Sequence, residues 1–96
     1  MSKKNVYIEI GQTVRNFREK KNMTQLELAR ILGYETSQFV SLFERGLSKI
    51  PMEVLGQLVI ILGIPEKHFK AILLKDFEAE ISAKINSGKK TAAKAI

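Results

Sequence analysis

Side chains that could carry catalysis are scarce in this sequence of 96 residues. An enzyme needs positioned acids, bases or nucleophiles, and the chain has one histidine, His68, next to Lys67, and no cysteine. No carboxylate pair stands among apolar neighbours, and neither a glycine-rich phosphate loop nor a cluster of metal ligands is present. We therefore expect a binding protein that is not an enzyme and that uses no metal or other cofactor.

Positive charge is unevenly distributed along the chain, whose net charge is +6. Residues 1–50 contain 9 Lys or Arg and 5 acids, residues 51–85 contain 4 and 5, and residues 86–96 contain 3 and none. A basic first half suits a polyanionic partner, because each cation that neutralises a phosphate releases counterions. A surface that is merely solvated would carry the same charge, so charge alone does not identify the partner.

The composition also bears on where the protein works. Without cysteine, the fold must be held by apolar packing alone, as is usual in the reducing cytosol. No apolar run approaches the roughly 20 residues of a membrane span, and no signal-peptide core follows the polar residues 1–5. We expect a cytoplasmic protein with no membrane partner.

Helical periodicity accounts for most of the chain, and Gly and Pro divide it into short segments. The expected helices cover residues 8–20, 24–32, 37–45, 51–62 and 65–85. Apolar residues recur at helical spacing in each of them, for example at Ile10, Val14 and Phe17 in the first. These elements predict an all-α domain over 8–85, an N-terminal arm over 1–7 and a disordered, flexible basic tail over 86–96.

The second and third segments have the pattern of a helix-turn-helix over about residues 24–46. Thr24 and Glu27 form a capping box that begins one helix, and Gly33 can take the left-handed conformation that ends it. Thr36 or Glu35 can then cap the next helix. Two short helices joined by a tight turn that contains glycine are typical of this motif.

Residues 23–46, M-T-Q-L-E-L-A-R-I-L-G-Y-E-T-S-Q-F-V-S-L-F-E-R-G, resemble the Cro and lambda-repressor-like (Xre) family. The motifs that match are T-Q-x-x-L-A from Thr24 to Ala29, the turn glycine Gly33, and E-R-G from Glu44 to Gly46. The resemblance extends through the first helix and the P-x-x-x-L-x-x-L after Pro51, over about residues 8–69. It implies a five-helix lambda-repressor-like DNA-binding domain with an extended C-terminal helix.

This resemblance implies that the third helix enters the major groove of double-stranded DNA. Aligned backward from Glu44, the residues that face the bases are Ser37, Gln38, Ser41 and Leu42. Gln38 suits the N6 and N7 edge of adenine, serines suit a base edge or a phosphate, and leucine suits a thymine methyl. No Arg or Lys on this face would read guanine, so we expect A·T pairs beneath it.

Alternatives remain open for each of these positions. The polar residues could be an ordinary helix surface. Leu42, with Phe39, could be a protein contact or a packing patch under Tyr34.

The resemblance also implies contacts that position the DNA backbone. Residues expected at phosphates are Gln25, Arg18, Arg45, Lys49 and Thr36. Arg18 and Glu44 resemble a family pair that joins the first helix to the third. Solvated charge and a weak surface ion pair are the alternatives.

Together these features predict a transcriptional regulator, specifically a nucleoid-associated repressor that binds a palindromic operator as a homodimer. Two half-sites multiply the discrimination that one module provides. The stripe Leu73, Phe77, Ile81 and Ile85 is the expected dimer seam, and the alternative is a core helix with a frayed end.

A second hypothesis is a protein-interaction module, such as the antitoxin of a toxin–antitoxin pair. Phe39, Leu42 and a fourth helix that is apolar almost all round favour it. DNA binding should weaken steeply as salt rises, whereas apolar binding to a protein partner should hardly change.

Overall fold

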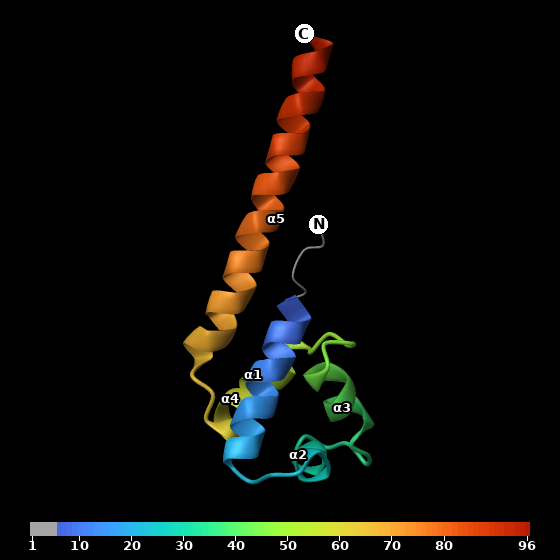
Figure 1. Ribbon diagram of the computed structural model, residues 1–96, viewed down its shortest axis with the longest axis vertical. Coiled ribbons are helices and arrows are strands. Elements are labelled where there is room, and N and C mark those ends of the chain that lie inside the picture. The colour runs from blue at the N-terminus through green and yellow to red at the C-terminus, as the bar shows by residue number, and fades with distance from the viewer. Residues whose placement is uncertain (1–5) are drawn as a thin grey trace.

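The computed structural model describes residues 6–96, which form five α-helices and no strand (Figure 1). The helices are α1 (Val6–Lys20), α2 (Gln25–Ile31), α3 (Gln38–Glu44), α4 (Met52–Leu62) and α5 (Glu66–Ala95). The predicted all-α class is thereby confirmed. Residues 1–5 of the expected N-terminal arm lie outside the described residues, and Val6 and Tyr7 belong to α1.

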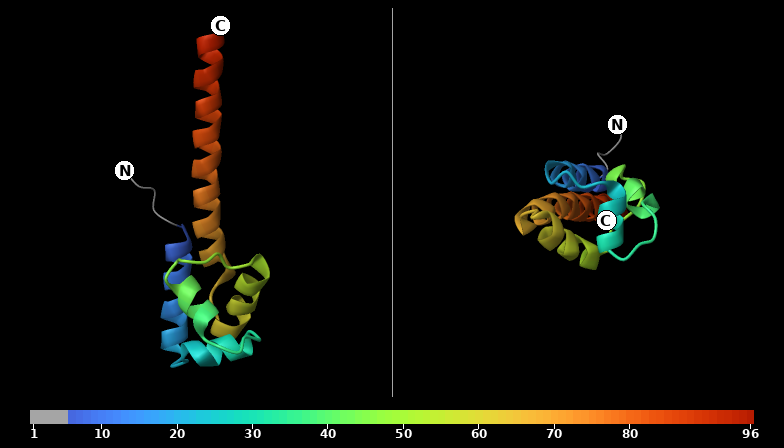
Figure 2. Two further views of the ribbon diagram at one scale, coloured as in Figure 1. Left: turned by 90° about the vertical axis from the view of Figure 1, so that its right-hand side faces the viewer. Right: turned by 90° about the horizontal axis from the view of Figure 1, so that it is seen from below.

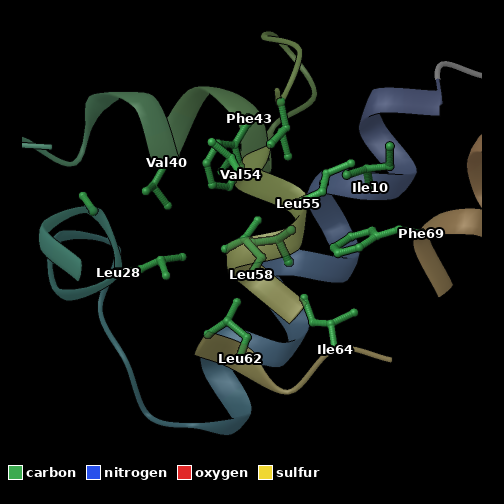
Figure 3. Close-up of a cluster of buried hydrophobic side chains, with 13 residues drawn as sticks. Ile10, Leu28, Val40, Phe43, Val54, Leu55, Leu58, Leu62, Ile64 and Phe69 are labelled. Carbon is green, nitrogen blue, oxygen red and sulfur yellow. The ribbon is translucent and has the colours of Figure 1, made fainter. Parts of the chain in front are cut away.

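A single apolar core joins the first four helices to the beginning of α5 (Figure 3). α4 lies at its centre, and its Leu58 is fully buried. The other buried members come from all five helices and the loops between them: Ile10, Val14, Leu28, Ala29, Val40, Phe43, Ile50, Val54, Leu55, Leu62, Ile64 and Phe69. With no disulfide or metal ligand set in residues 6–96, burial of these side chains is the main force that holds the bundle together.

Proline and glycine set the ends of α4 and the beginning of α5. Pro51 and Pro65 precede the two helices with φ of −57° and −59°, which suits a helix start where no N–H is needed. Gly63 ends α4 at a φ of +70°, in the left-handed region. Ile64, between Gly63 and Pro65, is buried and anchors this short connection.

The last helix is longer than predicted. The sequence predicts a helix that ends at Ile85 and a disordered tail over 86–96, but α5 continues to Ala95, so that prediction is wrong. Ser87 and Gly88 are poor helix formers, which favoured the tail. The lysines and alanines that follow are strong ones, and each turn satisfies the backbone of the turn before it.

α5 projects far beyond the bundle (Figure 2). The molecule measures 59 × 24 × 23 Å, and its radius of gyration of 17.1 Å exceeds the roughly 12.5 Å expected for a compact chain of this length. Every residue from Phe77 to Ile96 is exposed. The bundle therefore positions α2 and α3, while the outer part of α5 is available to other molecules.

Candidate nucleic-acid interface

The capping box predicted at the start of α2 is present in the structure. The backbone amide of Glu27 donates to the Thr24 hydroxyl at 3.0 Å, and the Thr24 amide donates to the Glu27 carboxylate at 2.9 Å. The second of these bonds lowers the pKa of the exposed Glu27 carboxyl below its ordinary value. The capping box fixes where α2 begins, and with it the position of Gln25.

The turn between α2 and α3 is held by glycine at one end and by aromatic packing at the other. Gly33 has a φ of +94°, which glycine adopts readily, and the amide of Tyr34 donates to the Ala29 carbonyl at 2.9 Å. The ring centres of Tyr34 and Phe39 lie 4.6 Å apart, and those of Phe39 and Phe43 lie 5.0 Å apart. Phe39 therefore packs within the molecule, in agreement with the alternative that it forms a packing patch under Tyr34.

α3 has a buried side and an outward side. Val40, Phe43 and Glu44 are buried, whereas Gln38 is exposed. The other predicted base-contact residues, Ser37, Ser41 and Leu42, are partly exposed. α3 begins at Gln38, one residue later than expected, and the Gln38 amide donates to the Thr36 hydroxyl over a long 3.4 Å.

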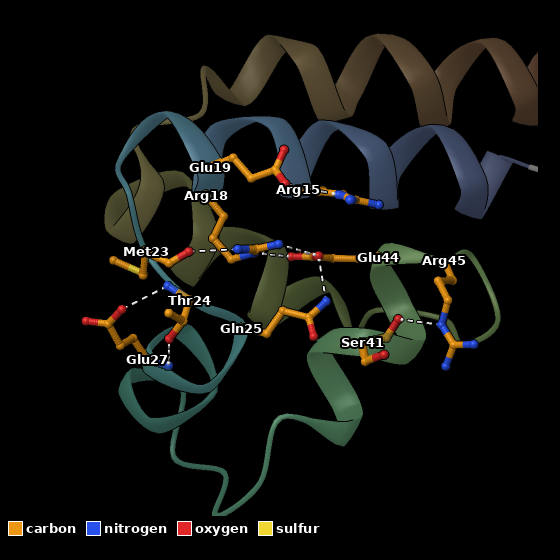
Figure 4. Close-up of polar contacts among 10 residues, drawn as sticks. All are labelled: Arg15, Arg18, Glu19, Met23, Thr24, Gln25, Glu27, Ser41, Glu44 and Arg45. Carbon is orange, nitrogen blue, oxygen red and sulfur yellow. Dashed lines mark hydrogen bonds and ion pairs between the residues drawn. The ribbon is translucent and has the colours of Figure 1, made fainter.

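A buried carboxylate connects three helices behind this face (Figure 4). Glu44, which is 5% exposed, accepts hydrogen bonds from Nε and Nη2 of Arg18 at 2.7 and 3.0 Å and from Nε2 of Gln25 at 3.0 Å. Nη1 of Arg18 donates to the carbonyl of Met23 at 2.7 Å. The hydrogen bonds that Arg18 donates to Glu44 raise the pKa of the Arg18 guanidinium more than burial lowers it. The network fixes α3 against α1 and α2.

The residues predicted to contact the DNA backbone lie in different environments. Arg18 is 8% exposed and serves the network, and Gln25 is partly buried with one amide hydrogen committed to Glu44. Arg45 is exposed at the end of α3, where its Nε donates to the Ser41 carbonyl at 3.2 Å (Figure 4).

The two remaining backbone candidates are exposed at opposite ends of α3. Thr36 precedes the helix. Lys49 follows it, with its ammonium 5.9 Å from the centre of the Tyr7 ring. A helix with an exposed glutamine thus has a cation beyond its C-terminal end, an arrangement suited to a polyanion.

One residue that positions α3 received no role from the sequence. A Cβ on Gly11 of α1 would lie 2.2 Å from the carbonyl oxygen of Phe43 and 2.7 Å from that of Glu44. Only glycine lets the backbones of α1 and α3 approach this closely. Its place in the I-G-x-x-V-R pattern of the first helix was the one available signal, and the pattern alone did not indicate a helix crossing.

Other features of residues 6–96 concern metal ligands, a surface groove and membrane insertion. In residues 6–96 no group of three His, Asp or Glu side chains could hold a metal ion. An apolar groove of about 370 Å³ lies between α4 and the beginning of α5, with Leu55, Val59, Phe69 and Leu73 among its lining residues. None of the helices in this range has the length and hydropathy needed to cross a membrane.

Comparison with known proteins agrees with this geometry. A family model described as helix-turn-helix matches residues 14–69, more than half of the chain. Among solved structures, a mutant of the restriction-modification controller protein C.Esp1396I is similar, with a TM-score of 0.59 and 20% sequence identity over 78% of this chain and 99% of that one. No curated protein sequence matches. The structural similarity shows a shared fold. The family match runs from Val14 in α1 to Phe69 in α5.

Proposed function

Because the chain belongs to the Xre/Cro-like helix-turn-helix family of DNA-binding transcription regulators, we propose that α3 enters the major groove of an operator and that the protein represses transcription from it. The observation that carries this proposal is the arrangement of α3. Its inner side is fixed by Val40, Phe43 and the Glu44 network, while Gln38 stands exposed on the other side. A rigid helix with an outward hydrogen-bonding residue is what direct readout requires.

The proposed base contacts follow from the chemistry of the outward residues. The Gln38 amide suits the edge of adenine: its Nε2 donates to N7, and its Oε1 accepts from the N6 amino group. Ser37 and Ser41 bond a base edge or a phosphate, and Leu42 packs on a thymine methyl. The operator therefore has A·T pairs at the centre of each half-site.

Cations and polar groups around α3 are proposed to hold the DNA backbone. Arg45, Lys49 and Thr36 are exposed around the helix and contact phosphates directly. Gln25 contributes the amide hydrogen that Glu44 does not use. Arg18, which is buried, supports these contacts mainly by holding Glu44 and thereby α3.

We further propose that the protein binds as a homodimer through α5. Phe77, Ile81 and Ile85 are exposed and apolar, whereas Leu73 partly packs on the core. Sedimentation equilibrium of the full chain and of a chain cut after Lys75 tests this role. We expect a dimer for the first and a monomer for the second, and an unchanged dimer after the cut would contradict it.

Selection of binding sites from random duplex DNA with the purified protein tests the function as a whole. We expect a palindrome whose half-sites are separated by one helical turn of about 10 base pairs or by a multiple of it, A·T pairs in each half, and affinity that falls steeply with salt. Recovery of no preferred sequence, or of a uniformly G·C core, would contradict the proposal. Reporter transcription from the selected site then distinguishes repression from activation.

A protein partner is a second candidate, and the groove between α4 and α5 favours it. Ile60, at the edge of this groove, is 83% exposed, and Met52 is exposed as well. An antitoxin or similar module would use such a surface. Binding that persists in high salt and that Ile60→Lys abolishes would identify this function.

A further inference from the structure

The outer half of α5 carries apolar residues that no other part of residues 6–96 covers. Leu74, Phe77, Ile81 and Ile85 are 62%, 58%, 41% and 54% exposed, and every residue after Asp76 is exposed. A helix that stands alone in water is marginally stable, because most helices in proteins are stabilised by packing of one face. Figure 2 shows this half of α5 extending beyond the bundle.

These residues belong to a longer, regularly spaced series, which we call the α5 seam. The seam consists of Leu74, Phe77, Ile81, Ile85, Gly88, Ala92 and Ala95. Its mean spacing is about 3.5 residues, the repeat with which two helices wind around each other. At about 100° per residue its members fall within an arc of about 80°. This arc lies away from Phe69 and Ile72, which pack against the bundle.

We infer that the α5 seam pairs with the seam of a second copy of this chain in antiparallel orientation, centred near Ala83. The inference rests on the homodimer proposed above and gives it a geometry. Both orientation and centre follow from the sizes and charges of the residues along the seam.

The sizes of the seam residues favour the antiparallel arrangement. Around this centre, Leu74 faces Ala92 of the second copy, Phe77 faces Gly88, and Ile81 faces Ile85. In the first two pairs a large residue meets a small one, and in the central pair two isoleucines of equal size meet, which suits dense packing. A parallel pair would instead oppose two phenylalanines at one level and two glycines at another, which gives crowding followed by a void.

Gly88 faces open space among residues 6–96. Glycine is unfavourable inside a helix, and a Cβ at Gly88 would meet nothing within 4 Å. In the antiparallel pair it accommodates the Phe77 ring of the second copy, so the neighbouring molecule supplies the packing that the single chain lacks.

Charge favours the same orientation. Residues 74–84 contain three acids and two lysines, whereas residues 85–95 contain three lysines and no acid. Antiparallel pairing places the first segment of one copy beside the second segment of the other. Parallel pairing would bring the two lysine-rich segments together. Glu78 and Lys89 lie on one flank of the seam at nearly equal distances from its centre. They therefore face each other across the pair, twice by symmetry.

The pairing also brings the end of the second copy to the bundle. In this register its Ile96 is level with Lys70, which lines the groove between α4 and α5. Ile96 is fully exposed in the single chain. The dimer thus extends from the seam to the edge of this groove.

Cross-linking of cysteine variants of the full chain determines the orientation, because the sequence has no cysteine of its own. Glu78→Cys and Lys89→Cys are prepared separately, and each is treated with a short bismaleimide alone and after mixing. We expect the mixture to give a cross-linked dimer and each variant alone to give none, since like positions lie about 15 Å or more apart along the axis. Cross-links within each variant alone would show parallel pairing and overturn the inference.

Charge exchange tests the same contact without a reagent. Sedimentation equilibrium of Glu78→Lys and of Lys89→Glu should show dimer dissociation constants raised about five- to tenfold, and the double variant should recover most of this loss. Two unaffected single variants, or a double variant no better than the singles, would overturn the pairing. DNA binding by the same proteins is measured separately. A monomeric wild type that still binds its operator would refute the pairing and leave the DNA-binding proposal standing.

Discussion

The carboxylate of Glu44 in α3 accepts two hydrogen bonds from Arg18 in α1, at 2.7 and 3.0 Å, inside the bundle. Two parallel bonds fix the relative orientation of these groups as well as their distance. Because Glu44 is one turn from the outward Ser41, the ion pair determines the position of the proposed DNA-reading face. The first prediction concerns this pair.

Replacing Glu44 by Ala should lower the free energy of unfolding by about 3–5 kcal/mol, because Arg18 would remain buried without its counter-charge. Urea unfolding followed by circular dichroism measures the change. Glu19→Ala is the matched control, since Glu19 forms an exposed ion pair with Arg15 at 3.3 Å, and its removal should change stability by less than about 1 kcal/mol. Equal losses of unfolding free energy in the two variants would show that the buried ion pair stabilises the protein no more than the exposed one does.

Replacing Gly11 by alanine and replacing Gly56 by alanine should have opposite effects on stability. A Cβ at Gly11 would collide with the backbone of α3, so Gly11→Ala should destabilise the protein by about 1–3 kcal/mol or more. Gly56 lies in α4 with nothing within 4 Å of an added Cβ, so Gly56→Ala should stabilise it by about 0.5–1 kcal/mol. Thermal and urea unfolding test both. A neutral Gly11→Ala would mean that α1 and α3 lie further apart.

The proposed contacts to bases and to phosphates should respond differently to mutation. Gln38→Ala should weaken binding to the selected operator about 10- to 100-fold and leave binding to unrelated DNA nearly unchanged. Lys49→Ala should weaken both alike and reduce the slope of log affinity against log salt by about 1. Fluorescence anisotropy over a salt series measures both quantities. If Gln38→Ala weakened both DNAs equally, Gln38 would not read a base.

Acid should weaken the start of α2 through Glu27. Its pKa is lowered by the bond from the Thr24 amide, so its stabilising contribution is complete above the ordinary value of 4.5 and is lost as the pH falls through the lower folded value. The stability advantage of the wild type over Glu27→Gln should therefore shrink between pH 6 and pH 3. Urea titrations at several pH values measure it, and parallel profiles for the two proteins would exclude this role.

Local signals predicted the elements that hold the candidate site. Thr24, Glu27 and Gly33 act within one or two turns of helix, so their spacing alone indicated where α2 begins and ends. The inward positions Val40 and Phe43 followed from helical periodicity. The pairing of Arg18 with Glu44 came from the resemblance, because no local pattern indicates a contact between residues 26 positions apart.

Features that depend on tertiary contacts were not predictable in the same way. The bond from Gln25 to Glu44 needs the ends of α2 and α3 to meet, and the role of Gly11 needs α1 to cross α3 closely. The length of α5 was underestimated for another reason. Ser87, Gly88, three lysines and a low apolar content favour a disordered tail over residues 86–96, but the helix propensity of the lysines and alanines prevails.

The placement of the two tyrosines gives the protein a built-in optical reporter. The chain contains no tryptophan, so its ultraviolet emission comes from Tyr7 and Tyr34. Tyr34 lies against Phe39 at the beginning of α3, and Tyr7 lies near Lys49 beyond its end. Any shift of α3 on engaging a ligand changes the surroundings of both phenol rings, so unlabelled protein can be followed by its own fluorescence in a stopped-flow instrument.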